Sequence, residues 1–127
     1  MNKKIIVTAS LFGILAVILG AFGAHGLKSL ISSSDLENWK TGVSYHFYHT
    51  LALLFLSTMV RYRDRFIEFA YYAFTAGIFL FSGSLYLLST RAVTGLEAGI
   101  LGPITPIGGL MFILGWVFLL LAAIKNK

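Results

Sequence analysis

The run IIVTASLFGILAVILGAFGA, residues 5–24, decides the fold class of this chain, because its 20 consecutive residues carry no charge. A helix of about 20 apolar residues crosses the roughly 30 Å hydrocarbon core of a bilayer. Three further uncharged runs follow, at residues 41–60, 69–90 and 98–124. The first run exceeds the roughly 7–15 residues of a signal-peptide apolar region, so we expect a retained span there. Helices are expected throughout, because lipid cannot satisfy an open backbone.

The composition of the chain agrees with an integral membrane protein. Of its 127 residues, 57% are hydrophobic and 12% are charged, and the mean hydropathy is +0.84. Soluble domains carry roughly 25% charged residues, and a chain of this size has too little interior to hide so much apolar surface. The composition therefore excludes a soluble globular enzyme and a disordered tail. The net charge of +5 lies in short clusters between apolar runs, which argues against a nucleic-acid-binding module.

The four runs predict an all-α, integral membrane four-helix bundle with short loops, formed by a single transmembrane domain over residues 1–127. The spans are expected near residues 5–24, 41–60, 69–90 and 103–124. The last begins at Pro103 to Pro106, because proline suits the first turn of a helix and disrupts its interior. Before the second span, Ser34 and Glu37 have the spacing of a capping box, which predicts a helix start at Asp35.

The placement of basic residues predicts the orientation of the bundle. With the N-terminus inside, seven basic residues face the cytoplasm: Lys3, Lys4, Arg61, Arg63, Arg65, Lys125 and Lys127. Three then face outward: Lys28, Lys40 and Arg91. An excess of lysine and arginine marks the cytoplasmic side, so both termini are predicted to be cytoplasmic.

Polar and small residues gather, on this topology, in the outer half of the predicted bundle. The candidate polar cluster comprises His25, His46, His49, Ser82, Ser84, Tyr86 and Thr105. The glycines expected to bring helices together are Gly20, Gly23, Gly42, Gly83, Gly108 and Gly109. Small residues also recur at helical spacing in two stripes, one of Ala9, Gly13, Ala16, Gly20 and Ala24, the other of Gly108, Gly115 and Ala122. Such stripes pack helices within a bundle or against a partner.

Four interpretations of the histidines compete. The first is hydrogen bonding between helices, which is favoured because such bonds are the ordinary role of polar groups in membrane bundles. The second is a metal site of His25, His46 and His49, although spacing alone indicates it weakly. The third is an outward-opening site for a quinone, a lipid headgroup or a proton. The fourth, an intramembrane hydrolase using Ser84 and His49, is disfavoured because the sequence has neither G-x-S-x-G nor H-E-x-x-H.

Several motifs together resemble a known family. They are GAFGAHG (20–26), YHFYHTLAL (45–53), FSGSLY (81–86), TPIGG (105–109) and GW (115–116), with Trp39, Thr41 and Gly42. They resemble the small bacterial inner-membrane proteins catalogued as a domain of unknown function, which have a small eukaryotic transmembrane relative. The resemblance covers essentially the whole chain and implies a four-span plasma-membrane protein without a known activity. It also implies that glutamine is found at the position of His46, which suits hydrogen bonding better than a three-imidazole site.

We therefore expect a non-enzymatic membrane protein without cofactor or metal. The polar cluster is expected to act in helix packing or in association with another membrane protein or a second copy, with ligand binding through the histidines as the alternative. The bilayer is the expected environment, and no nucleic-acid partner is expected.

Overall fold

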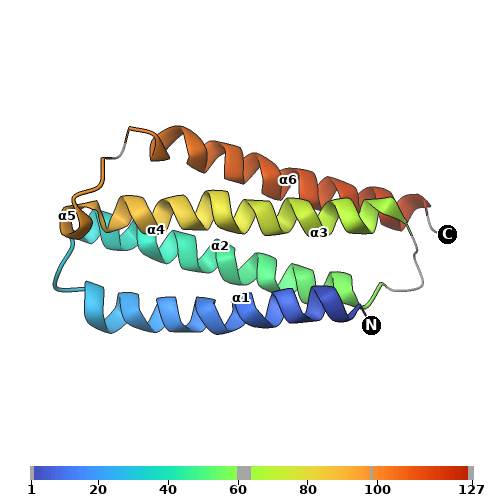
Figure 1. The fold of residues 1–127 in the computed structure, drawn as a ribbon, viewed down its shortest axis with the longest axis horizontal. Helices are drawn as coiled ribbons and strands as arrows, with labels where there is room; N and C mark the ends of the chain where they lie inside the picture. Colours follow the sequence, from blue (N-terminus) through green and yellow to red (C-terminus); the bar gives the residue numbers. More distant parts are fainter. Residues whose placement is uncertain (1, 60–63, 98, 126–127) are drawn as a thin grey trace.

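The computed structural model describes residues 2–59, 64–97 and 99–125, and within these ranges the chain is all-helical, without strands. The elements are α1 (Lys3–Phe22), η1 (Gly23–Leu27), α2 (Ser33–Ser57), α3 (Arg65–Gly77), η2 (Ile78–Ser82), α4 (Gly83–Ser89), α5 (Arg91–Thr94) and α6 (Leu101–Lys125). The long elements form four helical rods, α1 with η1, α2, α3 with η2 and α4, and α6. Neighbouring rods along the chain run antiparallel (Figure 1). The first and third rods each include a π-helical segment, η1 and η2.

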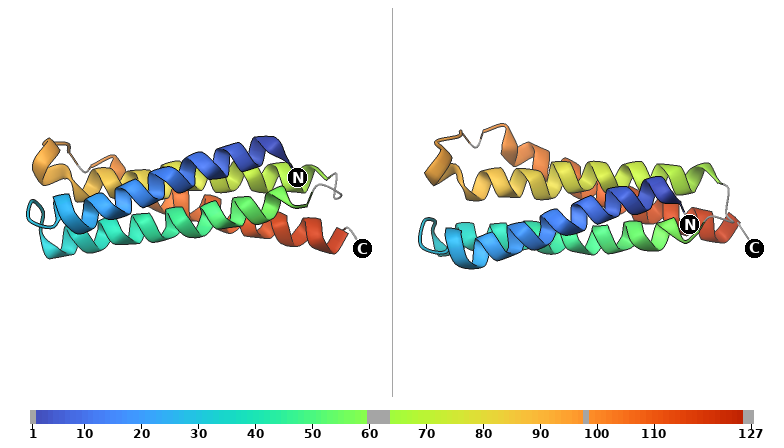
Figure 2. Two further views of the ribbon diagram at one scale, coloured as in Figure 1. Left: turned by 90° about the horizontal axis from the view of Figure 1, so that it is seen from below. Right: turned by 60° about the horizontal axis from the view of Figure 1, so that its bottom comes forward.

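Both chain termini lie at one end of the bundle, here called the terminal end, and the opposite end is called the distal end (Figure 1). The rods form two hairpins, because α1 packs mainly on α2 while α3, η2 and α4 pack on α6. α2 joins the hairpins through its contacts with α4 and η2. Figure 2 shows the bundle from two further sides. In contrast, the backbones of α2 and α6 do not come close to each other, so contacts between these two helices are made by side chains.

Three of the four rods are long and apolar enough to cross a membrane: Lys3–Leu27, Arg65–Ser89 and Leu101–Lys125. The second predicted span, residues 41–60, corresponds to α2, which is not among these three. α2 is as long as α6, at 25 residues, but it carries two histidines, two tyrosines and several hydroxyl residues along its length. α2 is therefore less apolar than the other three rods because of its composition and not because of its length.

Two helix starts differ from the sequence prediction. The cap of α2 is Ser32, whose hydroxyl accepts a hydrogen bond from the Asp35 backbone N–H at 3.1 Å, so the helix begins at Ser33 and the predicted cap, Ser34, lies inside its first turn. α6 begins at Leu101, two residues before the predicted Pro103, and continues through Pro106.

The α3–α6 hairpin is held by reciprocal aromatic and glycine contacts. A Cβ at Gly115 would meet the ring of Phe74, and a Cβ at Gly77 would meet the ring of Phe112. Each helix therefore offers a Phe-x-x-Gly pair, and in antiparallel register each ring lies where the other helix has no side chain. This contact is what brings the two backbones close.

The apolar core occupies the terminal half of the bundle, where Leu53, Leu56, Ala70 and Phe74 are almost completely buried. Ion pairs tie the helix ends together. At the terminal end Lys4 lies 3.8 Å from Glu68.

Three of the basic residues used to predict orientation, Arg61, Arg63 and Lys127, lie outside the described residues, as does Val60, the predicted end of the second span.

Candidate functional site

The two histidines of α2 lie on the face that packs inside the bundle. Gly42, His46 and His49 are spaced by four and three residues, so they share one side of the helix. All three are buried, as is Thr50, whose hydroxyl donates to the His46 carbonyl at 2.8 Å. Because they are buried on one face, His46, His49 and Thr50 are kept away from lipid although the helix has a modest hydropathy.

His46 connects α2 with α4. Its side chain is 1% exposed, and its Nδ1 lies 2.8 Å from the hydroxyl of Tyr86. The tyrosine ring passes over Gly42, where a Cβ would lie 3.1 Å from a ring carbon. The edge of Phe12 on α1 closes the other side, with ring centroids 5.7 Å apart. Gly42 therefore provides the space that lets Tyr86 reach the imidazole.

His49 connects α2 with α6. The indole N–H of Trp116 donates to His49 Nε2 at 3.1 Å, and His49 Nδ1 lies 2.7 Å from the carbonyl of Tyr45. An indole nitrogen can only donate, so Nε2 is the acceptor and Nδ1–H donates to the carbonyl. The ring also stacks on Phe112, with centroids 3.6 Å apart and planes within 8°. Both nitrogens of this neutral imidazole are thus engaged inside the protein.

Two serines at the end of the third rod's π-helical segment, Ser82 within η2 and Ser84 two residues after it, bond to different neighbouring helices. Ser82 donates to the Gly42 carbonyl on α2 at 2.7 Å. The hydroxyl of Ser84 bonds to that of Thr105 on α6 and donates to the Phe81 carbonyl at 3.0 Å. The third rod is therefore hydrogen-bonded to both of its neighbours at nearly the same level.

His25 is apart from the other predicted site residues. It is exposed in η1 at the distal end, whereas His46 and His49 are buried between helices. Within the described ranges, no three histidine, aspartate or glutamate side chains group closely enough to hold a metal ion. The remaining predicted polar residues form separate bridges between pairs of helices, and among the described residues no hydrogen bond joins one bridge to the next.

The predicted glycines divide into close and loose contacts. A Cβ at Gly108 would meet the backbone of Phe81, and one at Gly23 would meet the indole of Trp39, whose N–H donates to the Leu19 carbonyl at 2.9 Å. Gly20, Gly83 and Gly109 make looser approaches, because a Cβ at each would lie at an ordinary contact distance from Val43, Ile78 and Phe81 respectively.

Sequence reasoning assigned Gly115 to a packing stripe but did not predict that the rings of Phe74 and Phe112 lie against Gly115 and Gly77, and it missed the bridging role of Trp116. The repeated Phe-x-x-Gly spacing in the third and fourth rods was the available signal for the glycines. For Trp116 there was none, because its partner is a residue 67 positions earlier in the chain.

A groove runs between α2 and α6, and Trp116 lies at the boundary of its two parts. The distal groove has a volume of about 610 Å³ and is lined by Tyr45, His49, Pro106 and Phe112 among others. The terminal groove has a volume of about 600 Å³ and lies on the other side of the indole. Among the predicted polar residues in the described part of the chain, only His49 lines one of these two grooves, the distal groove.

Comparison with known proteins identifies relatives along the whole chain. A sequence profile described as "Protein of unknown function (DUF423)" matches residues 19–109. The UPF0382 membrane protein YwdK of Bacillus subtilis is 42% identical over 97% of this chain and 98% of its own length. The UPF0382 membrane protein SAB0533 of Staphylococcus aureus is 41% identical over 97% of both chains, and a UPF0382 membrane protein of Haemophilus influenzae is 35% identical over 100% and 98%. No solved structure matches the chain.

Proposed function

The chain belongs to the DUF423 family, whose relatives are bacterial membrane proteins, and from this premise we propose that it is a non-enzymatic, four-span plasma-membrane protein whose buried polar residues hold its helices together. The observation that carries the proposal is the pair of histidine bridges, His46 to Tyr86 and His49 to Trp116. They connect α2 with both helices of the second hairpin.

The length and inward polarity of α2 support a fourth span. At 1.5 Å per residue its 25 residues extend about 38 Å, which exceeds the roughly 30 Å hydrocarbon core. Its two histidines bond to other helices, so their low hydropathy does not require contact of these groups with water. The single-domain bundle then has both termini on one side.

The predicted orientation can be tested by cysteine labelling, because the chain has no cysteine of its own. In intact cells, a membrane-impermeant maleimide should label a Lys28→Cys variant and should reach Lys3→Cys only after permeabilisation. Labelling of Lys3→Cys alone in intact cells would reverse the orientation, and labelling of both would contradict a first span that crosses the membrane.

The small-residue stripes support internal packing over partner association. Ala9 and Ala16 are buried in the first hairpin, and Gly108, Gly115 and Ala122 are buried in the second. Stripes used in this way leave no continuous small-residue face for a second protein.

The hydrogen bonding of the polar groups supports a non-enzymatic role. A nucleophilic serine requires a base within hydrogen-bond reach, and in the described part of the chain neither His46 nor His49 bonds to a serine. The curated relatives also carry no enzymatic name.

Ligand binding is the second candidate, and one observation favours it: His49 lines the distal groove, where Tyr45 is 41% exposed. Pockets for small apolar ligands combine aromatic walls with a few polar groups in this way.

His49→Ala separates the two roles. Helix packing predicts a loss of stability with unchanged co-purifying small molecules. Ligand binding predicts that mass spectrometry of the protein in native nanodiscs shows a stoichiometric molecule that the variant loses while it stays folded. Wild-type stability in His49→Ala would contradict the packing role of this bridge.

A further inference from the structure

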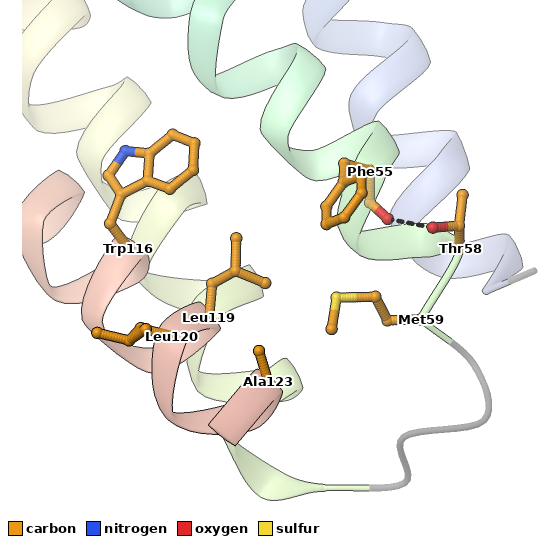
Figure 3. A pocket seen from close by; sticks show the side chains of 7 residues that line it. All are labelled: Phe55, Thr58, Met59, Trp116, Leu119, Leu120 and Ala123. Atoms are coloured by element: carbon orange, nitrogen blue, oxygen red, sulfur yellow. Dashed lines mark hydrogen bonds between the residues drawn. The ribbon is translucent and has the colours of Figure 1, made fainter. Parts of the chain in front are cut away.

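The terminal groove is an apolar recess between two helices of the bundle. Phe55 on α2 and Thr58, which directly follows α2, face Trp116, Leu119 and Ala123 on α6 across it (Figure 3). It is open along one side, and its volume is about 600 Å³. Apolar surface of this kind is not left to water, so in a bilayer an apolar group fills it.

The length of the groove favours a lipid chain over a partner helix. From Trp116 to Ala123 the groove extends about 10 Å along α6, which lies within the roughly 15 Å depth of one leaflet. At its inner limit the indole of Trp116 reaches across to His49, to which it is bonded at 3.1 Å. A transmembrane helix would continue across both leaflets, whereas an acyl chain ends within one.

A positive charge lies just beyond the terminal end of the groove. Lys125 is two residues beyond Ala123 on α6; it is not among the residues that line the groove, and its Nζ lies 3.4 Å from the Asp64 carboxylate. The lysine side chain is 57% exposed while that of Asp64 is 3% exposed, so the outermost charge is the ammonium group. An ammonium has three donors and can therefore pair with a phosphate while it keeps the carboxylate.

We infer that the terminal groove binds one acyl chain of an anionic phospholipid whose phosphate pairs with Lys125. The inference rests on the proposed function, because the proposed topology places the terminal end at the cytoplasmic leaflet, which is rich in anionic lipid. One lysine near such a surface contributes about fivefold to the preference for an anionic headgroup.

Quenching of Trp116 by brominated lipids tests this site, because the indole lines the groove. The protein is placed in phosphatidylcholine discs with rising fractions of phosphatidylglycerol brominated at mid-chain, and in the reverse mixture. The same titrations of Trp116→Phe measure the contribution of Trp39, which is 5% exposed. We expect half-maximal quenching at an about fivefold lower fraction of brominated phosphatidylglycerol than of brominated phosphatidylcholine.

Matched variants separate the charge from the recess. Lys125→Gln should abolish the preference, whereas Asp64→Asn, which removes the same ion pair and retains the ammonium, should keep it. Ala123→Phe fills the groove and should weaken quenching by both lipids. Ile124→Phe is the control, because Ile124 is 61% exposed and does not line the groove.

Three results would overturn the inference: equal quenching by the two lipids in the wild type, a preference that survives Lys125→Gln, or full quenching in Ala123→Phe. Weak quenching by both lipids together with a stoichiometric second chain in native mass spectrometry would assign the groove to a partner helix instead. The preference in discs does not depend on orientation in cells. Reversed cysteine labelling would therefore refute the proposed topology and leave the lipid site standing.

Discussion

Replacement of Gly108 by alanine tests the closest helix contact in the second hairpin. A Cβ at this position would collide with the backbone nitrogen of Phe81 and lie 2.6 Å from the carbonyl carbon of Leu80. Carbon atoms in ordinary contact are about 3.5–4.0 Å apart. Because the opposing atoms belong to the backbone of η2, no change of rotamer can make room. α6 must therefore move away by about 1 Å.

The free-energy cost follows from what this shift disturbs. Overpacking of a well-packed site costs about 1–3 kcal/mol. The shift also strains the hydroxyl pair of Ser84 and Thr105, and a hydrogen bond between membrane helices contributes about 1 kcal/mol. Alanine offsets up to about 1 kcal/mol through its higher helix propensity. We expect Gly108→Ala to lower the free energy of unfolding by roughly 1–3 kcal/mol.

Gly109→Ala is the matched control, because its Cβ would lie 3.8 Å from the Phe81 side chain, an ordinary contact. It should leave stability unchanged or raise it by up to about 1 kcal/mol. The free energy of unfolding is measured by dodecyl sulfate titration in mixed micelles, followed by circular dichroism. If Gly108→Ala is as stable as Gly109→Ala, then α6 does not pack as closely against the η2 backbone at Gly108 as the structure indicates.

Three further predictions concern the polar residues. A double-mutant cycle of His46→Phe and Tyr86→Phe should give a coupling of about 0.6–1.7 kcal/mol, the range for hydrogen bonds between membrane helices, and a coupling near zero would refute the bridge. His25→Ala should change the free energy of unfolding by less than about 0.5 kcal/mol, since the side chain is exposed; a larger loss in the same titration would show a contact absent from this fold. Asp35→Asn removes the 3.7 Å ion pair with Arg91 at the distal end and should cost up to about 1 kcal/mol at low salt. That cost should shrink in high salt, and a salt-independent loss would point to another cause.

Much of the fold could be predicted from the sequence. The uncharged runs located three of the rods to within a few residues, because length and apolarity are local properties of the chain. α2 was also found by its run, although its hydropathy alone would not distinguish it. Its cap was misplaced by two residues, since Ser32 and Ser34 both offer a hydroxyl and only the path of the incoming loop selects between them.

The candidate site could be predicted in its residue types but not in its pairings. His46 and His49 are neighbours on one face of α2, yet their partners are on different helices, Tyr86 and Trp116. His25 has the same chemistry as both but is exposed in η1, so residue type alone could not exclude it.

The sequence by itself determined the surroundings of this protein, because hydropathy and charge act through solvent and membrane and need no knowledge of neighbours. Only the tertiary structure decided how the two hairpins dock, and with it which glycines are indispensable. Gly108 and Gly109 are adjacent and identical, but helix rotation places a Cβ of the first against the η2 backbone and a Cβ of the second at an ordinary contact distance from the Phe81 side chain. The same docking leaves α2 and α6 apart, so the grooves beside Trp116 result from packing between helices and have no signature along the chain.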